Sequence, residues 1–598
     1  MMEKVKQFLK WLTPFIIFLV LALLVVSIPI IKKQTFLGSD SLFHFNRFYD
    51  AAMQLKTHKI SYFQTNYGFL GTGRMLSTLY GPVAAYAGGF LLLVAGTWFK
   101  FEILTDLIVL IVSALGMYKL CRVNNVDKYP AIFIGFIYMY SSMVMQWVTA
   151  QQFTGVGAMI VPFVMIYATQ MVRKNDVSFF GFAFVMSLLI QTHLMSAMIT
   201  MIGILPFFVV GLVKAVDKKQ RVKMLLHTIY AALITLVLTI NVWYNLIYIS
   251  ATNHLLPVYP VPEVRTYGYN FNVQSLVNIM KPTEFILFIF VLYFVIRRFK
   301  QVDILTKTTA LTGFFFLVIS WSHFPWGVFQ YLIPQLSYTL QFPKRFLVIA
   351  FVCLLVTFGR ILTYEIKNNT HKSNYAVVVT ILLLIIGSAG LDFYAIHQRS
   401  VNYVSLNTKH HKNNKNDNSI YYYMKRHHRT LQKDTQSHKL SNLLEDIIKA
   451  TPDYVPSYKQ IKGHSEYDKL NPYKLYYQQY IEKNHNKKLH FKHVVRKDGS
   501  LTVRFKLRKA QKIQVPLAKY AQTQVTVNGT VKNVKTTKIG AIIVSAKKGK
   551  NTVNVKYVTS FTTRLMMVFT WIGWILFGIF AITKIKRNSN KMVILVAL

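Results

Sequence analysis

Three polar residues interrupt an otherwise apolar sequence directly after the first long hydrophobic segment. Asp40, His44 and Arg47, in the stretch LGSDSLFHFNR at 37–47, are spaced i, i+4 and i+7. This spacing places them on one face of a helix. A carboxylate there can take a proton from a reacting hydroxyl, and a neighbouring imidazole or guanidinium can orient it or bind an anion. The structural alternative is that Ser39 caps the helix while Asp40 interacts with its positive end.

A second polar group opens a later apolar segment. Lys344 and Arg345 lie in the stretch QFPKRF at 341–346. The topology described below places this pair on the outer side of a membrane, against the usual preference of Lys and Arg for the inner side. A positive pair at that position indicates a phosphate site, because Arg offers a planar fork of donors. Snorkelling of both side chains to lipid head groups is the simpler alternative.

Further polar residues fall at the same predicted level and are secondary candidates. They are Glu102, Asp106, His193, Glu263, Arg265 and His323. Ionisable groups close to the apolar region are expensive to keep and usually have a task. A lone intramembrane histidine, however, is more often packed and hydrogen-bonded than catalytic, so His193 carries little weight by itself.

The sequence predicts neither a metal nor another cofactor. Asp40 and His44 could share a divalent cation, but two ligands do not define a site. No Walker-type glycine-rich loop is apparent, so nothing indicates ATP as the energy source. The two cysteines, Cys121 and Cys353, lie in or beside apolar segments, which argues against a disulfide framework and a cysteine metal site.

The residues that must position these groups form an α-helical polytopic membrane protein. Of 598 residues, 53% are hydrophobic and 15% aromatic. Apolar runs of about 20 residues recur, and each is long enough to cross a hydrocarbon layer of about 30 Å. The first run is too long for a signal peptide and is expected to be a retained anchor.

Clusters of Lys and Arg between these runs predict the topology, because such loops are usually cytoplasmic. Alternate crossings give about twelve transmembrane helices, with both termini cytoplasmic and the polar candidates facing outside. The expected spans are near 11–31, 103–121, 129–147, 153–172, 177–193, 195–214, 226–250, 283–299, 305–321, 346–364, 374–395 and 562–583. The apolar stretch 80–98 does not fit this alternation, so we expect a juxtamembrane or re-entrant helix within a first external loop at 32–102.

The chain therefore divides into three parts. Residues 1–395 are the expected transmembrane domain, 396–560 a basic extracytoplasmic domain, and 561–598 the last transmembrane helix with a short cytoplasmic tail. Short alternating segments rich in Val, Ile and Thr predict a small antiparallel β-sandwich at 489–560. The Asn528-Gly529 pair predicts a tight hairpin, because type I′ turns need positive φ at both central residues.

The formal net charge is +47, and the extracytoplasmic domain holds about 33 basic and about 9 acidic residues. Nucleic acid is the usual partner of such a charge but is not expected outside a membrane. One explanation is solubility plus attraction to anionic lipid head groups of the bilayer. The other is an acidic polymer on the outer surface, and the two are compatible.

Several of these motifs resemble a known class. A first span followed by an external Gly-x-Asp-x-x-x-His helix resembles the GT-C class of polyprenyl-phosphate-sugar glycosyltransferases. The QFPKRF and Thr192-His193-Leu194 segments, and the strand-rich region before the last span, resemble bacterial YfhO-type membrane proteins. They also resemble the family called 6-pyruvoyl-tetrahydropterin-synthase-related membrane proteins, for which we expect no pterin activity. Lys344 departs from the pattern, because an aromatic residue is expected there.

The resemblance implies transfer of a sugar from an undecaprenyl-phosphate carrier to an anionic cell-surface polymer such as teichoic acid. In that hypothesis Asp40 is the general base of an inverting reaction, His44 orients it or binds phosphate, and Arg345 with Lys344 or Arg47 stabilises the leaving phosphate. A transporter or flippase is the main alternative, although mid-membrane polar groups and paired halves are not evident. A non-catalytic scaffold of the cell envelope is the third.

Overall fold

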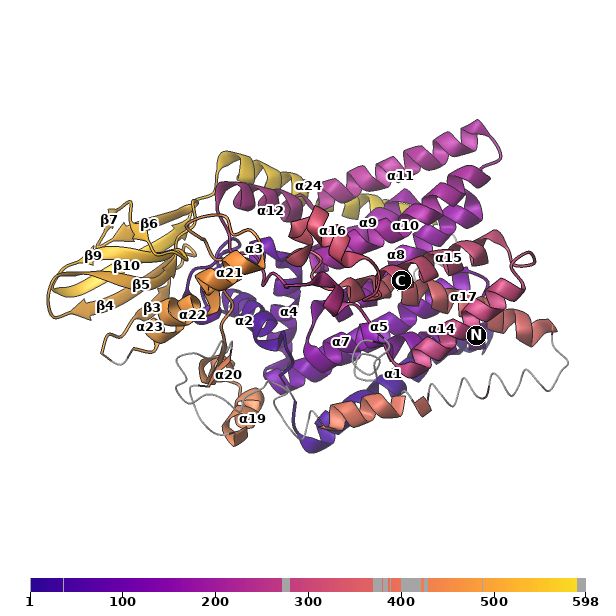
Figure 1. Ribbon diagram of the computed structural model, residues 1–598, viewed down its shortest axis with the longest axis horizontal. Helices are drawn as coiled ribbons and strands as arrows, with labels where there is room; N and C mark the ends of the chain where they lie inside the picture. Colours follow the sequence, from indigo (N-terminus) through magenta and orange to yellow (C-terminus); the bar gives the residue numbers. More distant parts are fainter. Residues whose placement is uncertain are drawn as a thin grey trace.

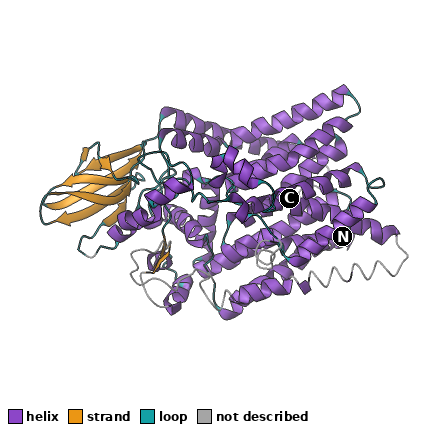
Figure 2. Cartoon of the chain, viewed as in Figure 1, coloured by secondary structure: helices purple, strands orange, loops and turns teal. Residues whose placement is uncertain are grey.

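The computed structural model describes residues 2–35, 37–270, 280–368, 379, 386–387, 389–398, 421–423, 428–486 and 488–588. Long helices run side by side along the molecule, and a β-sandwich lies at one end of them (Figures 1 and 2). The helices of the first part are α1 (Met2–Lys32), α2 (Ser41–Thr57), α3 (Leu76–Leu79), α4 (Pro82–Ala95), α5 (Trp98–Val123), α6 (Lys128–Met139), α7 (Ser142–Ala150), α8 (Phe153–Lys174), α9 (Phe179–Thr192), α10 (Leu194–Lys214), α11 (Lys218–Leu238), α12 (Ile240–Thr252), α14 (Pro282–Arg297), α15 (Ile304–Ile319), α16 (Trp326–Leu332) and α17 (Leu347–Asn368).

Several helices are apolar enough to belong to a membrane protein. The described residues hold seven helices long and apolar enough to cross a membrane, or eight if the bent pair α6 and α7 counts as one span. The predicted count of twelve is therefore not confirmed. Three predicted spans correspond to helices of 14 to 16 residues, α9, α14 and α15, and the predicted span 374–395 lies largely outside the described residues.

Two predicted spans are wrong in detail. The expected span 226–250 is two helices, because α11 begins earlier, at Lys218, and ends at Leu238, after which α12 starts. The expected span 129–147 bends by 42° between α6 and α7. Hydrophobicity alone does not reveal such breaks, since apolar residues continue on both sides of each one.

The stretch 80–98 forms α4, a helix of 14 residues that packs against α2. At 1.5 Å per residue such a helix is about 21 Å long, less than the hydrocarbon thickness of about 30 Å. Gly88 and Gly89 make the contact close, because a Cβ at Gly89 would come within 2.7 Å of the Ala52 backbone nitrogen. Its membrane placement stays a prediction.

The second part is mixed α and β. Short elements come first: β1 (Tyr421–Tyr423), α19 (His428–Gln436), α20 (Ser441–Asp446), β2 (Ile447–Lys449), α21 (His464–Leu470), α22 (Pro472–Tyr476) and α23 (Glu482–Asn484). The sandwich follows, with β3 (Lys492–Val495), β4 (Leu501–Leu507), β5 (Gln511–Ala518), β6 (Thr523–Val527), β7 (Thr530–Val531), β8 (Lys535–Thr536), β9 (Ala541–Ala546) and β10 (Gly549–Tyr557). The last helix, α24 (Phe561–Asn588), packs against α11 and α12.

The sandwich consists of two antiparallel sheets, as the strand-rich sequence predicts. One sheet has the order β3-β4-β10-β6-β7 and the other β5-β9-β8. Val503 and Val553 from the first sheet share a core with Val515 and Val544 from the second. The predicted hairpin is confirmed: Asn528 and Gly529, with φ of 49° and 91°, join β6 to β7.

Candidate functional site

The loop that carries Asp40 lies on the end of a short helix. The backbone N–H of Gly38 donates to Oε1 of Gln151 at 2.6 Å, and the N–H of Asp40 donates to the carbonyl of Ala150 at 3.2 Å. A Cβ at Gly38 would come within 2.3 Å of the Ala150 Cα. Position 38 therefore needs glycine, and the end of α7 fixes where Asp40 lies.

Asp40 occupies the N-cap position of α2, but its side chain makes no capping hydrogen bond. Its Oδ1 lies 3.5 Å from Nζ of Lys449, and 42% of its side chain is exposed. The same Lys449 Nζ donates to the carbonyl of Ser39 at 2.7 Å. Asp40, and not Ser39, is therefore the N-cap residue, and its carboxylate faces Lys449 and solvent.

His44 and Arg47 follow on α2 and are both buried. The Nδ1 of His44 and Nη1 of Arg47 lie 3.2 Å apart, and the imidazole ring stacks on Phe153 at 4.1 Å between centroids. Burial is the main cause that holds the pKa of His44 well below its usual value, and the positive charge of Arg47 is the next largest cause. The ring is therefore neutral at neutral pH and accepts at Nδ1 from Arg47.

The guanidinium of Arg47 is held by the chain around Tyr80. It donates from Nη2 to the carbonyls of Tyr80 and Gly81 at 3.1 and 3.0 Å, and it lies 4.6 Å from the centroid of the Tyr80 ring. Burial lowers the pKa of Arg47 to about 10, which leaves it charged at neutral pH. Its Nε is buried without a hydrogen-bond partner among the described residues.

Lys344 and Arg345 lie in a short 3-10 helix, Pro343–Phe346, that leads into α17. Arg345 donates to the carbonyl of Leu340 at 2.6 Å, and both cations lie over the Phe342 ring, at 5.5 and 4.8 Å from its centroid. Gln341, with φ of 55°, donates to the Tyr259 carbonyl at 2.9 Å. These contacts fix the direction in which the two cations point.

Electrostatic contacts bring the two predicted groups together. Asp40 interacts with both Lys344 and Arg345. Tyr80 lies against Arg47, and Asp40 and Arg345 also contribute to the electrostatic environment of its hydroxyl. His193, whose Nδ1 lies 2.7 Å from Oγ of Ser196, interacts with Arg345 and Arg47 and so belongs to the same cluster.

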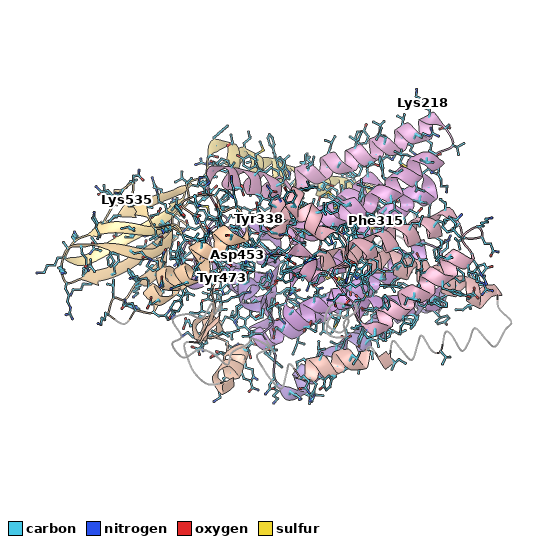
Figure 3. The ribbon with its side chains drawn as sticks, in the orientation of Figure 1. Lys218, Phe315, Tyr338, Asp453, Tyr473 and Lys535 are labelled. Carbon is cyan, nitrogen blue, oxygen red and sulfur yellow. The ribbon has the colours of Figure 1, made fainter. Side chains whose placement is uncertain are left out.

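Three residues of the outer domain complete this cluster, and sequence reasoning missed them. They are Lys449, Asp453 and Tyr454. Burial raises the pKa of Asp453 to about 6, while Arg74 and Lys449 oppose that rise and Asp40 adds to it. Tyr454 interacts with Tyr80, Asp453, Arg345 and Arg47. Figure 3 shows Asp453 at the junction between the helices and the outer domain. Nothing local in the sequence links these positions to Asp40, which is about 400 residues away.

The remaining candidates lie in other contacts. Glu102 and Asp106 lie one turn apart on α5 and interact with each other. Glu263 and Arg265 form an exposed ion pair at 2.9 Å. His323 lies 3.1 Å from Oγ of Ser322 and against the Trp321 ring. The described contacts join none of these five to Asp40.

Within the described part of the chain, no group of three or more His, Cys, Asp or Glu is arranged to hold a metal. The sequence predicts no cofactor, and this stays a prediction.

No family model matches the chain, and no curated protein matches it either. Among solved structures, it is similar to the crystal structure of the Archaeoglobus fulgidus oligosaccharyltransferase in the apo form, with a TM-score of 0.38 and 12% sequence identity. The match covers 65% of this chain and 56% of that one, so the chain spans little more than half the length of that enzyme. A likeness at this TM-score carries no argument about function, which has to rest on the residues themselves.

Proposed function

We propose that the protein is a membrane glycosyltransferase that moves a sugar from undecaprenyl phosphate to an anionic cell-surface polymer such as teichoic acid. The observation that carries this proposal is the exposed Asp40 carboxylate within electrostatic reach of two half-buried cations, Lys344 and Arg345. These groups lie where apolar helices meet a basic domain, so a lipid-linked donor and an anionic acceptor can meet there. The sequence resemblance to GT-C enzymes supports the same reaction.

The reaction requires a base and a site for a leaving phosphate. The acceptor hydroxyl gives its proton to Asp40 while its oxygen attacks the anomeric carbon of the sugar. The bond between that carbon and the phosphate oxygen breaks on the opposite face, so the configuration inverts. The electron pair leaves with the lipid phosphate, and Arg345 and Lys344 stabilise the charge.

His44 and Arg47 have a different part in this scheme. Arg47 is committed to two backbone carbonyls and to His44, and the neutral His44 ring is stacked on Phe153. Both are positioning residues, because they fix α2 against the chain around Tyr80. The buried charge of Arg47 also adds positive potential at the site.

The direct test compares surface-polymer glycosylation, by mass spectrometry or NMR, in cells lacking the protein and complemented with wild type or Asp40→Asn. We expect wild type alone to restore the sugar. Asp453→Asn is tested in parallel, because Asp453 is the other carboxyl in the cluster. If Asp40→Asn keeps full activity and Asp453→Asn loses it, the general base is Asp453 and not Asp40.

Arg345 is tested through its donor dependence. Arg345→Ala removes a cation from the leaving phosphate, so we expect kcat/KM for the lipid-linked donor to fall by about 10²-fold or more. The matched control is Arg265→Ala, which removes an exposed arginine that pairs with Glu263. Equal donor kinetics in the two variants would contradict the phosphate role of Arg345.

The same cells, together with an assay of the purified protein, distinguish a transferase from a transporter and from a scaffold. A transporter or flippase would change the amount of lipid-linked sugar on the outer leaflet without forming a product in a purified assay. A scaffold would not depend on a single carboxylate. Unchanged surface glycans in cells without the protein would contradict the transferase proposal.

A further inference from the structure

A polar pocket lies in the outer domain, apart from the cluster around Asp40. It has a volume of about 220 Å³. Its lining comes from the end of α12 with residues 253–254, the segment 456–457, the connection 519–521 after β5, and residues 536, 537 and 540 at β8 and the turn after it. This volume is far more than the ~10–15 Å³ that one water needs. The pocket is therefore large enough for a ligand.

The walls of the pocket carry hydroxyl groups and positive charges. Thr252, Ser457 and Thr536 supply hydroxyls, and His254 and Lys519 supply basic groups. No carboxylate is among the described residues that line it. Hydroxyl donors next to cations suit a phosphate on a polyol better than an apolar or cationic ligand.

Ser457 offers a second reason to expect a polar ligand. Its Oγ is buried and has no hydrogen-bond partner among the described residues. Leaving a buried hydroxyl unsatisfied costs free energy, so such a group calls for an explanation. Because Ser457 lines the pocket, this hydroxyl is a candidate donor to a ligand oxygen.

A short stretch of backbone connects the pocket to the Asp40 cluster. The segment 454–457 pairs with 254–256: the N–H of Tyr454 donates to Leu256, that of Leu256 to Val455, and that of Ser457 to His254, at 2.8, 2.8 and 2.6 Å. Asp453 and Tyr454 interact with the Asp40 cluster, whereas Pro456 and Ser457 line the pocket. Four extended residues reach at most about 14 Å. The pocket and the cluster are thus close and held at a fixed separation.

We propose that this pocket binds a phosphate-bearing polyol unit of the acceptor polymer while a neighbouring unit reacts at Asp40. The inference rests on the proposed function for the identity of the reaction. The pocket itself is defined by its own charge and hydroxyl groups. A long acceptor occupies both the pocket and the site at Asp40, whereas a short acceptor occupies one of the two at a time.

The test is equilibrium binding of a fluorescent glycerol-phosphate oligomer to the purified full-length protein at fixed ionic strength. We expect Lys519→Ala to raise the Kd about tenfold, equivalent to about 1.4 kcal/mol. His254→Ala should raise it in the same direction. Lys519→Gln keeps much of the side-chain stem and should weaken binding as Lys519→Ala does, which separates loss of charge from misfolding.

The matched control is Lys506→Ala, which removes an exposed lysine from β4 in the other sheet. It should leave the Kd within about twofold of wild type. If Lys519→Ala and Lys506→Ala weaken oligomer binding equally, the pocket proposal is wrong, because the oligomer is then attracted to the basic surface as a whole. Failure of the wild type to bind the oligomer at all would overturn it too.

Asp40→Asn separates the two proposals. In the Asp40→Asn background, Lys519→Ala should still raise the Kd about tenfold, since Asp40 does not line the pocket. If the wild type binds the oligomer through the pocket but transfers no sugar, the pocket proposal holds and the proposed function is contradicted. If the wild type transfers sugar but its binding does not depend on the pocket residues, the proposed function holds and the pocket proposal is contradicted.

Discussion

The buried carboxyl group of Asp50 and the half-buried carboxyl group of Asp453 lie at different parts of the site. Oδ1 of Asp50 accepts from the backbone N–H groups of Asn66, Tyr67 and Gly68 at 2.8, 2.7 and 3.2 Å, which fixes the first external loop on α2. Burial raises the pKa of Asp50 to about 6, against these hydrogen bonds. Asp453 has a pKa raised to about 6 as well, also because of burial.

These shifts predict a pH dependence of stability. A carboxyl whose pKa is higher in the folded than in the unfolded protein stabilises the fold at low pH, and that contribution disappears as the pH rises through about 6. Wild type should therefore lose more stability between about pH 4 and about pH 7 than Asp453→Asn does. Thermal unfolding of both purified proteins across this range measures the difference.

Burial lowers the pKa of His493 to about 4, and this histidine acts in the opposite direction because its contribution is lost as the pH falls. It is common to both proteins, so the difference between them isolates Asp453. Parallel curves for the two proteins would contradict the assignment.

At the scale of single residues, the sequence predicted only the part of the cluster that comes from the first 345 residues. The spacing of Asp40, His44 and Arg47 and the unusual Lys344-Arg345 pair were visible as local patterns. Lys449, Asp453 and Tyr454 were not, because they lie in a segment without periodicity and reach the site only through the tertiary fold. The spacing also could not show that Arg47 is committed to backbone carbonyls.

At the scale of elements, α7 is the part that sets the site. Its first residue is held by Glu284, whose carboxylate accepts from the N–H and Oγ of Ser142 at 2.9 and 3.1 Å. Its last residues hold Gly38 and Asp40. Lys281, at the start of α14, bonds to Asp392 and to the carbonyl of Tyr140. A buried ionic group therefore fixes one end of α7, and the Asp40 loop depends on the other.

Gly38→Ala tests this dependence. The new Cβ would overlap the Ala150 backbone, so the loop must move, at a cost of about 1–3 kcal/mol. We expect transfer activity to fall at least tenfold while the protein stays folded, measured by transfer assay and gel filtration. Gly327→Ala is the matched control, since nothing lies within 4 Å of a Cβ there. Equal activity of both variants would show that the loop tolerates displacement.

The breaks between helices were the least predictable feature of the fold. The apolar run from 226 to 250 contains Thr239 between α11 and α12, but threonine does not by itself end a helix. The strands of the sandwich were easier to predict, because alternation of buried and exposed residues is a property of each strand alone.

At the scale of the whole molecule, the C-terminal domain is fixed to the helices through the segment 58–81 between α2 and α4. Arg74 is fully buried and donates to Thr451 Oγ1 and Tyr476 OH at 3.1 and 3.3 Å, and also to the carbonyl of Asp453. Asn66 donates to the carbonyl of Gly499 at 2.7 Å, and Phe63 stacks on Tyr557. Figure 1 shows the sandwich continuing the long axis of the helices.

Arg74→Ala should loosen this junction. Loss of the charged hydrogen bonds is expected to cost about 2–3 kcal/mol. The outer domain should then be cut faster by protease, with a lower unfolding temperature and reduced transfer. Lys59→Ala is a milder comparison, because it removes a single half-buried bond to Val495. Unchanged proteolysis of Arg74→Ala would show that the sandwich is held by its apolar contacts alone.

The distance along the chain between the two halves of the site has a consequence for biosynthesis. Asp40 emerges from the ribosome early, whereas Lys449, Asp453 and Tyr454 emerge more than 400 residues later, and the first external loop acquires its partners at Gly499 and Val555 later still. A nascent or prematurely terminated chain that ends after α17 therefore lacks Lys449, Asp453 and Tyr454. Under the proposed function, the protein begins to use its donor only after these residues have been translated, and a chain that ends after α17 stays inactive.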